Sequence, residues 1–165
     1  MVRAFNPRTN GWKTLAPLPV GGVLPAAAVA ADGRIYVVCC GDLGPRPPSL
    51  EMYDPASNHW TEFGSLPDGR TFGFAAGAAR DGRIDLIGGC LATNVRQSSF
   101  NLYCGAPSSV EAYDPQTNKW ASLGLTLNPR QALAAVTGPD GRVYAVGGAG
   151  SGDGRLLEVI RQGSP

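Results

Sequence analysis

The sequence predicts an all-β protein made of repeated units of four short antiparallel strands. A phrase ending in tryptophan occurs three times, at residues 5–12, 53–60 and 113–120. In each copy an aromatic residue, an Asn-Pro or Asp-Pro pair, a later Asn and the final Trp keep the same offsets. Such self-similarity is the signature of a repeat architecture. The 23 Gly and 14 Pro residues suit many short strands joined by turns.

A second phrase follows each tryptophan and defines the first two strands of a unit. It opens with Asp-Gly-Arg, continues as an apolar run and closes on glycine, at residues 32–41, 81–89 and 140–148. Small apolar runs precede it as the first strands, at 26–31, 74–79 and 133–137. We expect Asp-Gly to form a two-residue type I′ turn, which needs positive φ at both central positions.

The other two strands of a unit flank the Asp-Pro turn. Third strands are expected at 2–5, 50–53, 110–113 and 156–160. Proline sets φ for the turn, and the preceding Asp accepts a backbone hydrogen bond two residues further on. Fourth strands begin at Trp12, Trp60 and Trp120.

Four antiparallel strands in a repeated unit are typical of a β-propeller blade. The small residues of the first strands suit the crowded inner wall around a propeller axis. The Trp side chains suit the widening space between neighbouring blades. The Gly-Gly pairs allow one strand to approach a packed neighbour closely.

These residues resemble the kelch-repeat family. The matching elements are Gly-Gly at the end of the second strand, Tyr-Asp-Pro on the third and Trp on the fourth, and they recur over nearly the whole chain. Two positions depart from the pattern, since Cys40 stands where the first glycine of a pair belongs and Asp85 replaces the usual tyrosine. The resemblance implies an all-β fold of kelch-type β-propeller blades.

Counting strands divides a single kelch-repeat domain, 1–165, into about three blades. The expected units are a partial blade at 2–24, blades at 25–66 and 67–125, and a partial blade at 126–161. Propellers usually close with four to eight blades. Three arrangements stay open: a piece of a longer propeller, a homodimer that closes a six-bladed ring, and a stable open array.

Charge and hydropathy argue against two classes of partner. The net charge is +1 and charged residues make up 16% of the chain, so there is no basic stripe for nucleic acid or anionic lipid. No apolar run approaches the roughly 20 residues that a membrane-spanning helix needs. No signal peptide precedes the first repeat, which slightly favours a cytoplasmic location and leaves the compartment open.

The four cysteines and the single histidine predict no metal or other cofactor. No Cys-x-x-Cys is present, and His59 alone cannot supply the ligands of a copper oxidase. Cys39 lies in an apolar strand and is expected to pack as a small apolar residue. Cys90 and Cys104 flank the one long insertion and are candidates for a disulfide in an oxidising compartment. The sequence also lacks a nucleophile elbow, a Ser-His-Asp set and a phosphate loop.

Candidate binding residues lie at one edge of the expected blades. The Asp-Gly-Arg and Asp-Pro turns share one edge and repeat almost unchanged. The loops after Gly-Gly and after the Trp strand share the other edge and differ in every unit, as binding loops do. The resemblance implies that Arg70 and Arg130 point toward a ligand there, and arginine grips carboxylates with paired hydrogen bonds. Solvated or packed loop arginines are the alternative.

Further candidates complete this predicted site. Phe72 could provide an apolar floor, Gln131 neighbours Arg130, and Arg96 and Tyr103 lie in the long insertion. The predicted function is a kelch-repeat scaffold that binds a protein or an acidic peptide and is not an enzyme. The alternative is a carbohydrate-active propeller similar to sialic-acid mutarotases, or a fragment of one, which would need acid and base groups around a closed channel.

Overall fold

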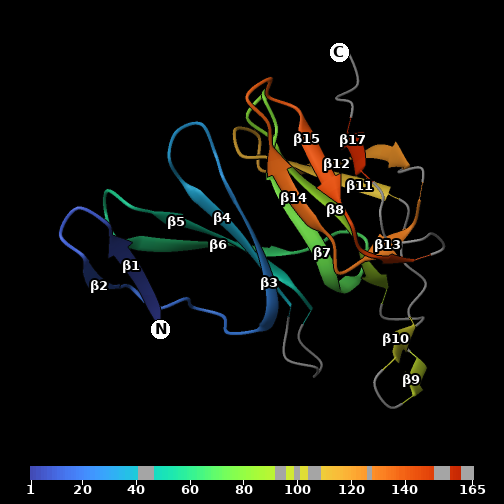
Figure 1. Cartoon of the computed structure of the whole chain (residues 1–165), viewed down its shortest axis with the longest axis horizontal. Coiled ribbons are helices and arrows are strands. Elements are labelled where there is room, and N and C mark those ends of the chain that lie inside the picture. Colours follow the sequence, from blue (N-terminus) through green and yellow to red (C-terminus); the bar gives the residue numbers. More distant parts are fainter. Residues whose placement is uncertain are drawn as a thin grey trace.

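The computed structural model describes residues 1–40, 47–91, 96–98, 101–103, 109–125, 128–150 and 157–160. In this part of the chain every regular element is a β-strand (Figure 1), so the all-β prediction is confirmed. Within the same residues there is no helix of the length and apolarity that crossing a membrane requires.

Two four-stranded antiparallel sheets form the centre of the molecule. The first full blade contains β3 (Val23–Val29), β4 (Ile35–Cys40), β5 (Ser49–Asp54) and β6 (His59–Ser65). The second full blade contains β7 (Arg70–Ala78), β8 (Ile84–Leu91), β11 (Ser109–Asp114) and β12 (Lys119–Leu125). In both blades the strands lie side by side in the order of the repeat, which confirms the predicted four-strand unit.

Smaller sheets lie at the two ends and in the insertion. The N-terminal hairpin pairs β1 (Val2–Asn6) with β2 (Gly11–Leu15). The C-terminal sheet has the order β14 (Ala134–Thr137), β15 (Val143–Val146) and β17 (Leu157–Ile160). Two short pairs were not expected from the repeat: β9 (Arg96–Ser98) with β10 (Asn101–Tyr103), and β13 (Arg130–Gln131) with β16 (Ala149–Gly150).

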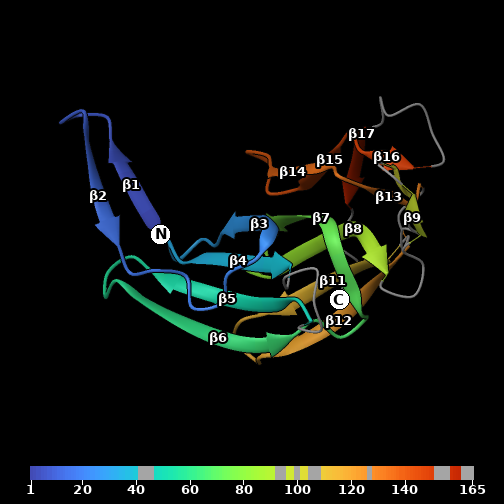
Figure 2. The same ribbon diagram turned by 90° about the horizontal axis from the view of Figure 1, so that it is seen from below.

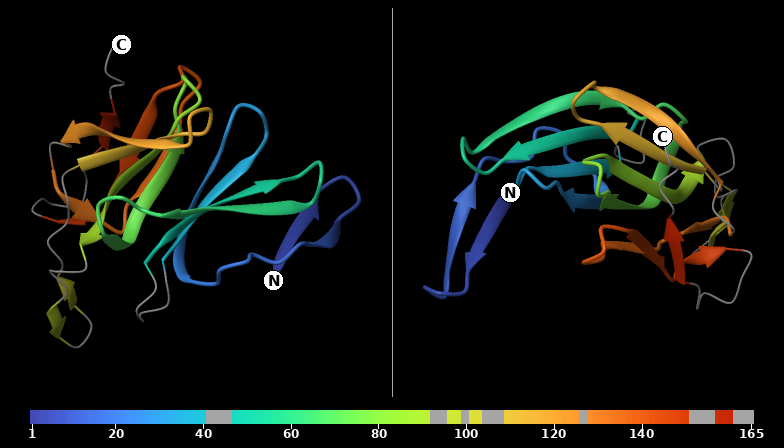
Figure 3. Two further views of the ribbon diagram at one scale, coloured as in Figure 1. Left: turned by 180° about the vertical axis from the view of Figure 1, so that it is seen from behind. Right: turned by 90° about the horizontal axis from the view of Figure 1, so that it is seen from above.

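The sheets follow one another in an open arc. Figure 2 and the right-hand view of Figure 3 place the N-terminal hairpin at one end and the C-terminal sheet at the other. The first strands of successive units pack together, β3 against β7 and β7 against β14. Their small side chains permit this approach, since Ala26, Ala28, Ala76 and Ala78 are all buried.

Apolar cores fill the two seams between successive sheets. Between the full blades, Tyr36, Val38 and Leu50 pack with Phe74 and Leu86. The second seam joins the second full blade to the C-terminal sheet, and its buried residues are Ala79, Ile87, Val110, Val143, Ala145 and Ile160. Burial of apolar surface in these seams is the main favourable term that holds the blades together.

The Asp-Gly-Arg turn differs from the prediction. Only Gly33 has positive φ, at 84°, so the turn is not type I′. The Gly33 N–H donates to the carbonyl oxygen of Ala30 at 2.9 Å, and the Arg34 N–H donates to Oδ1 of Asp32 at 3.0 Å. These bonds define a three-residue loop in which Gly33 takes the left-handed position. The Asp side chain bonds to the backbone and holds Asp32 out of the left-handed region.

The tryptophan phrase is explained by its turn and its aromatic pair. Asn58 and Asn118 both take φ 54° at the end of the turn, a conformation that Asn tolerates. The Tyr53 hydroxyl donates to Oδ1 of Asn58 at 2.8 Å, and its ring centroid lies 5.0 Å from that of Trp60. The Asn that recurs in the phrase therefore forms the turn, and the recurring aromatic residue and Trp form a ring pair next to it.

The tryptophans do not have equal surroundings. Nε1 of Trp60 donates to the carbonyl oxygen of Ala16 at 2.9 Å, which ties the first full blade to the chain that precedes it. Trp120 packs against the core between the full blades. Trp12 is 60% exposed, and its ring centroid lies 5.1 Å from that of Phe5 in the same hairpin.

Candidate functional site: the loop edge of the blades

Antiparallel topology separates the connections of the blades into two edges. The hairpin edge carries the Asp-Gly-Arg turns and the Asx-Pro turns, at residues 30–34, 79–83, 138–142, 54–59 and 114–119. The loop edge carries the links into each first strand, at 16–22, 66–69 and 128–129, and the loops that follow each second strand. Of these second-strand loops, 41–46, 92–95, 99–100, 104–108 and 151–156 lie outside the described residues.

On the hairpin edge, the arginine of each Asp-Gly-Arg turn forms an ion pair with the aspartate of the same turn. Arg34 pairs with Asp32 at 3.3 Å and Arg142 with Asp140 at 3.6 Å. Arg83 forms the equivalent ion pair with Asp81. The same pairing in every unit identifies these arginines as parts of the turn, and solvent-exposed pairs of this kind add little stability.

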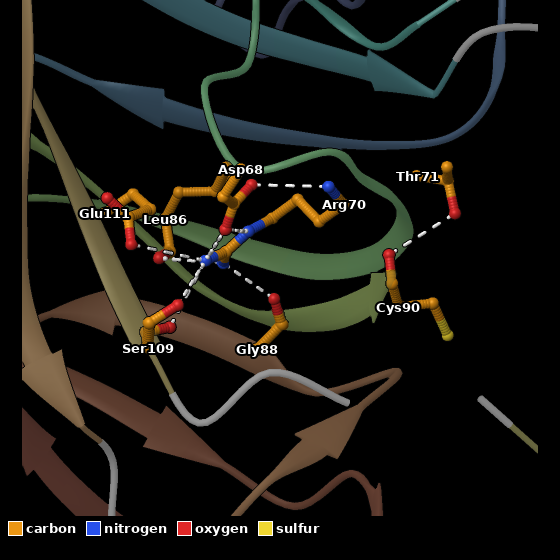
Figure 4. A network of polar contacts seen from close by, with 8 residues as sticks. All are labelled: Asp68, Arg70, Thr71, Leu86, Gly88, Cys90, Ser109 and Glu111. Carbon is orange, nitrogen blue, oxygen red and sulfur yellow. Dashed lines mark hydrogen bonds and ion pairs between the residues drawn. The ribbon is translucent and has the colours of Figure 1, made fainter. Parts of the chain in front are cut away.

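Arg70 makes a network of polar contacts at the loop edge (Figure 4). Although it is the first residue of β7, at the loop edge, its exposed fraction is 0%. Nη1 donates to the carbonyl oxygens of Gly88 at 2.7 Å and Leu86 at 3.3 Å. Nη2 donates to Oγ of Ser109 at 3.0 Å. The guanidinium group thus joins β7 to β8 and β11 across the sheet.

Two carboxylates balance the charge of Arg70. Oδ2 of Asp68 accepts from Nε at 2.6 Å, and Oε1 of Glu111 lies 3.9 Å from Nη2. A buried arginine needs this compensation, because an uncompensated buried charge is strongly destabilising. Arg70 is therefore an internal brace of the blade. The expectation that it points toward a ligand is corrected, because all three guanidinium nitrogens bond within the chain.

The neighbouring candidates of the site are also largely internal. Phe72 is buried in the core between the full blades.

Arg130 pairs in register with Gly150 as Arg70 pairs with Leu91, so both arginines hold the same place in their units. Arg130 is buried. Its backbone carbonyl crowds the α-carbon of Gly88 closely enough to exclude a Cβ, which confirms the close approach predicted for Gly-Gly.

Gln131 sits where the C-terminal unit meets the second full blade. It is partly buried, and its Oε1 contacts the sulfur of Cys90. The next residue, Ala132, donates its N–H to the carbonyl oxygen of Gly73 at 2.7 Å. Gln131 therefore contributes to the seam between units and leaves only part of its side chain to solvent.

The insertion candidates are placed by backbone alone. Tyr103 pairs in register with Arg96 across the short β9–β10 hairpin. For both residues the structure describes the backbone and not the side chain. Cys90 is disulfide-bonded. Cys104 lies outside the described residues, so the Cys90–Cys104 pairing stays a prediction. Cys39 is buried in β4, as expected for a small apolar residue.

The sequence analysis missed Glu51, which occupies the place of Glu111 in the first full blade. Glu51 is fully buried. Oε1 accepts from the Ser49 hydroxyl at 3.3 Å, and Oε2 has no hydrogen-bond partner. Burial raises the pKa of this carboxyl, and the Glu62 charge adds to the rise. The repeat contained the signal, because its third strands carry this Glu in two full units whereas only the second has the Arg.

Asp85 is a second buried carboxyl, in the seam beside the C-terminal sheet. Its exposed fraction is 0%, and neither Oδ atom has a hydrogen-bond partner. Burial raises its pKa from 3.8 to about 7; the Asp81 charge adds to this rise and Arg83 opposes it. Tyr144, which holds this position in the next unit, reaches Asp140 of the hairpin edge with its hydroxyl, a contact that the shorter Asp85 does not make.

Metal binding finds no support in the described part of the chain. No group of three or more His, Cys, Asp or Glu side chains there is arranged to hold a metal ion. His59, on the hairpin edge, is exposed.

Comparison with known proteins places these blades in a family. No family model matches the chain. Kelch-like protein terF of Aspergillus terreus is 28% identical over 97% of this chain and 35% of its own length. Kelch-like protein 28 of Homo sapiens is 32% identical over 75% of this chain and 20% of its own length. Alpha-scruin of Limulus polyphemus is 31% identical over 78% of this chain and 13% of its own.

Among solved structures, YjhT superposes with a TM-score of 0.70 at 18% sequence identity. The match covers 94% of this chain and 46% of that chain, and it shows a β-propeller fold. The chain therefore spans less than half the length of YjhT and of the curated relatives described above. The repeat pattern, the four-stranded blades and these relatives agree, and the chain belongs to the kelch-repeat β-propeller family.

Proposed function

We propose that this chain is a protein-interaction scaffold whose partner binds at the loop edge. The observation that carries the proposal is the contrast between the two edges. The hairpin edge repeats the same turn and the same Asp–Arg pair in every unit. The links of the loop edge differ from unit to unit, and differing loops on a repeated scaffold are where binding residues concentrate.

A rigid base under the loops supports this proposal. Arg70 fixes the start of β7 to two neighbouring strands, so the link before it is held from within the blade. Sites of this kind bind well because a preorganised loop loses little entropy on association. Several relatives are named as kelch-like proteins, which is consistent with the same general role.

The chemistry of the partner is the finer part of the proposal. An acidic peptide was expected from Arg70 and Arg130, but both side chains are buried. An acidic partner would therefore depend on Arg96 and Tyr103 in the insertion, with Gln131 at its margin. The exposed apolar side chain of Leu24, at the start of β3, is a further contact that a protein partner would use.

The test compares capture by matched variants of the full chain. Leu24→Asp places a charge on the loop edge at a left-handed position, φ 52°, that Asp tolerates. Arg142→Ser changes an exposed residue of the hairpin edge. Proteins retained by wild type and by Arg142→Ser, and lost by Leu24→Asp, support the proposal. Equal retention by all three, or turnover of a sialic acid with no retained protein, overturns it.

A second copy of the chain is the partner that we propose for the ends of the arc. The C-terminal sheet presents exposed apolar residues on the face away from the second full blade, namely Val136, Val146, Leu157 and Val159. At the other end, Phe5 and Trp12 are exposed, and β1 has one paired edge in the described structure. Unpaired edges and exposed apolar faces favour association with another chain.

Light scattering tests this self-association. The proposal predicts a mass that rises with concentration to twice the 17.1 kDa of one chain, and a loss of that rise in Val159→Arg. The control is Val29→Arg, on an exposed residue of β3 away from both ends. A mass of one chain at every concentration, or equal loss in both variants, would contradict it.

A further inference from the structure

In the second full blade, the strands around Arg70 bind a guanidinium group. Backbone carbonyls of Leu86 and Gly88, the Ser109 hydroxyl and the Glu111 carboxylate surround one guanidinium group. The acceptors come from β8 and β11, and the guanidinium comes from the first residue of β7, at the loop edge. A planar guanidinium matches such a set because its five donors are fixed in one fork.

The first full blade repeats this acceptor set. Glu51 lies opposite Val37, and Ser49 lies opposite Cys39, in the register of β4 and β5. The second full blade pairs its Glu with the corresponding residue of β8. Ser49 and Glu51 are both buried, and Ser49 donates to Glu51. Ser109 and Glu111, which contact Arg70 from β11, therefore have counterparts here.

The link at this blade has no arginine. Residues 16–22 read Ala-Pro-Leu-Pro-Val-Gly-Gly. Gly21 is equivalent to Arg70, because each lies the same number of residues before the end of its first strand, β3 or β7. Oε2 of Glu51 is left without a hydrogen-bond partner. A buried carboxylate oxygen without a donor costs stability, so an external guanidinium that reached Oε2 would be bound favourably.

We propose that Glu51 and Ser49 form a binding site for the guanidinium group of an arginine side chain carried by the protein partner. The proposal rests on the loop-edge function and gives the partner its chemistry. The arginine would enter beside the link at 16–22, at the same edge of the blade from which Arg70 enters its own blade. Gly21 and Gly22 are exposed, and a Cβ at Gly21 would meet no atom within 4 Å, so the backbone there leaves room for an approaching side chain.

Charge favours a cation at this place. Glu62 of β6 lies opposite Glu51 in register, whereas the equivalent neighbour of Glu111 is the uncharged Ser122. The other described groups against Glu51 are the Ser49 hydroxyl, the Val20 backbone and Val37 of β4. Two carboxylates thus face the site, and within the described residues no positive charge acts on the Glu51 carboxyl.

Titration of the full chain with Nα-acetyl-arginine amide tests the site directly. We expect saturable changes in the amide NMR signals of residues 49–51 and a rise in thermal midpoint. The lysine and citrulline amides serve as matched probes, one with a point charge and one neutral. Both should bind at least about tenfold more weakly, because neither offers a charged fork. Equal effects of all three probes would overturn the proposal.

Two variants separate the site from general folding effects. Glu51→Gln should abolish the arginine response. Gly21→Arg leaves Glu51 in place and supplies a guanidinium from the chain itself, so this variant should be more stable and should no longer respond to the probe. The arginine response should also strengthen as pH rises, because the bound form is the ionised carboxylate, whose pKa is raised. A Gly21→Arg protein that still binds the probe as wild type does would refute the assignment.

The outcomes for the site and for the loop-edge function can be distinguished. If Leu24→Asp loses the captured partner while Glu51→Gln and Gly21→Arg retain it, the loop-edge function stands and the arginine site is wrong. If the probe binds at Glu51 but Leu24→Asp and Arg142→Ser retain every partner equally, the site stands and the loop-edge function is wrong.

Discussion

Replacement of Asp85 by asparagine should change how the stability of this chain depends on pH. The carboxyl is buried on β8 with no hydrogen-bond partner. It shares a sheet face with Gly77, its neighbour in register, and Gly77 packs so closely on Val143 that a Cβ has no room. Ionising Asp85 therefore places a charge in the seam that joins the second full blade to the C-terminal sheet.

The magnitude follows from the pKa. Burial raises it from 3.8 to about 7, and at about 1.4 kcal/mol for each tenfold change in proton affinity this is about 4 kcal/mol. Below about pH 4 the carboxyl is protonated in both states and has no effect. Between about pH 4 and about pH 7 the unfolded chain releases the proton while the folded chain retains it, so the stability falls; above about pH 7 the loss is complete.

Urea unfolding at a series of pH values measures this effect. Wild type should lose up to about 4 kcal/mol of unfolding free energy between about pH 4 and about pH 7.5 from this group, and Asp85→Asn should lack that loss. The neutral amide is also buried without a partner, but its cost is the same at every pH. Asp114→Asn is the matched control, because Asp114 is a partly buried residue at the end of β11 whose pKa is lowered, chiefly by the Gln116 N–H. If Asp85→Asn follows the wild-type profile, the reasoning is refuted.

Three further substitutions test the packing. Arg70→Ala should cost about 3–5 kcal/mol in urea unfolding, because it leaves the buried Glu111 carboxylate uncompensated; a cost below about 1 kcal/mol would contradict the internal role of Arg70. Gly88→Ala should cost more than Gly64→Ala by differential scanning calorimetry, since both have positive φ but only Gly88 meets a neighbouring carbonyl; the strain alone is about 1–2 kcal/mol. Trp120→Ala should cost about 3–5 kcal/mol and Trp12→Ala far less, because only Trp120 packs on a core; equal losses would refute the assignment of seams.

Much of the fold could be predicted because its signals are local and repeated. The strand positions around Trp60 and Trp120 follow from alternating apolar runs and from Asp-Pro turns that recur in the sequence. Repetition averages out the ambiguity of any one short strand. The turn at Asp32-Gly33 was predicted with the wrong geometry, since the choice between two-residue and three-residue loops depends on a side-chain hydrogen bond that composition does not specify.

The candidate site was harder to predict because burial depends on distant strands. Arg70 looks like a loop arginine in the sequence, and only the proximity of β8 and β11 makes it internal. Glu51 is the reverse case, because a strand glutamate suggests a solvated residue until the sheet encloses it. Aligning the two full units would have found both residues, because the third-strand Glu occurs in both units whereas the Arg occurs in the second alone. The burial of Asp85 could be found only once the packing of the second full blade on the C-terminal sheet was known.

Hydrogen–deuterium exchange of the full chain with its captured partner tests the central claim most directly. The account predicts protection from exchange in the links at 16–22, 66–69 and 128–129, and wild-type exchange in the turns at 30–34, 54–59 and 114–119. Protection confined to those turns, with unchanged exchange in the links, would place the partner on the hairpin edge and contradict the account.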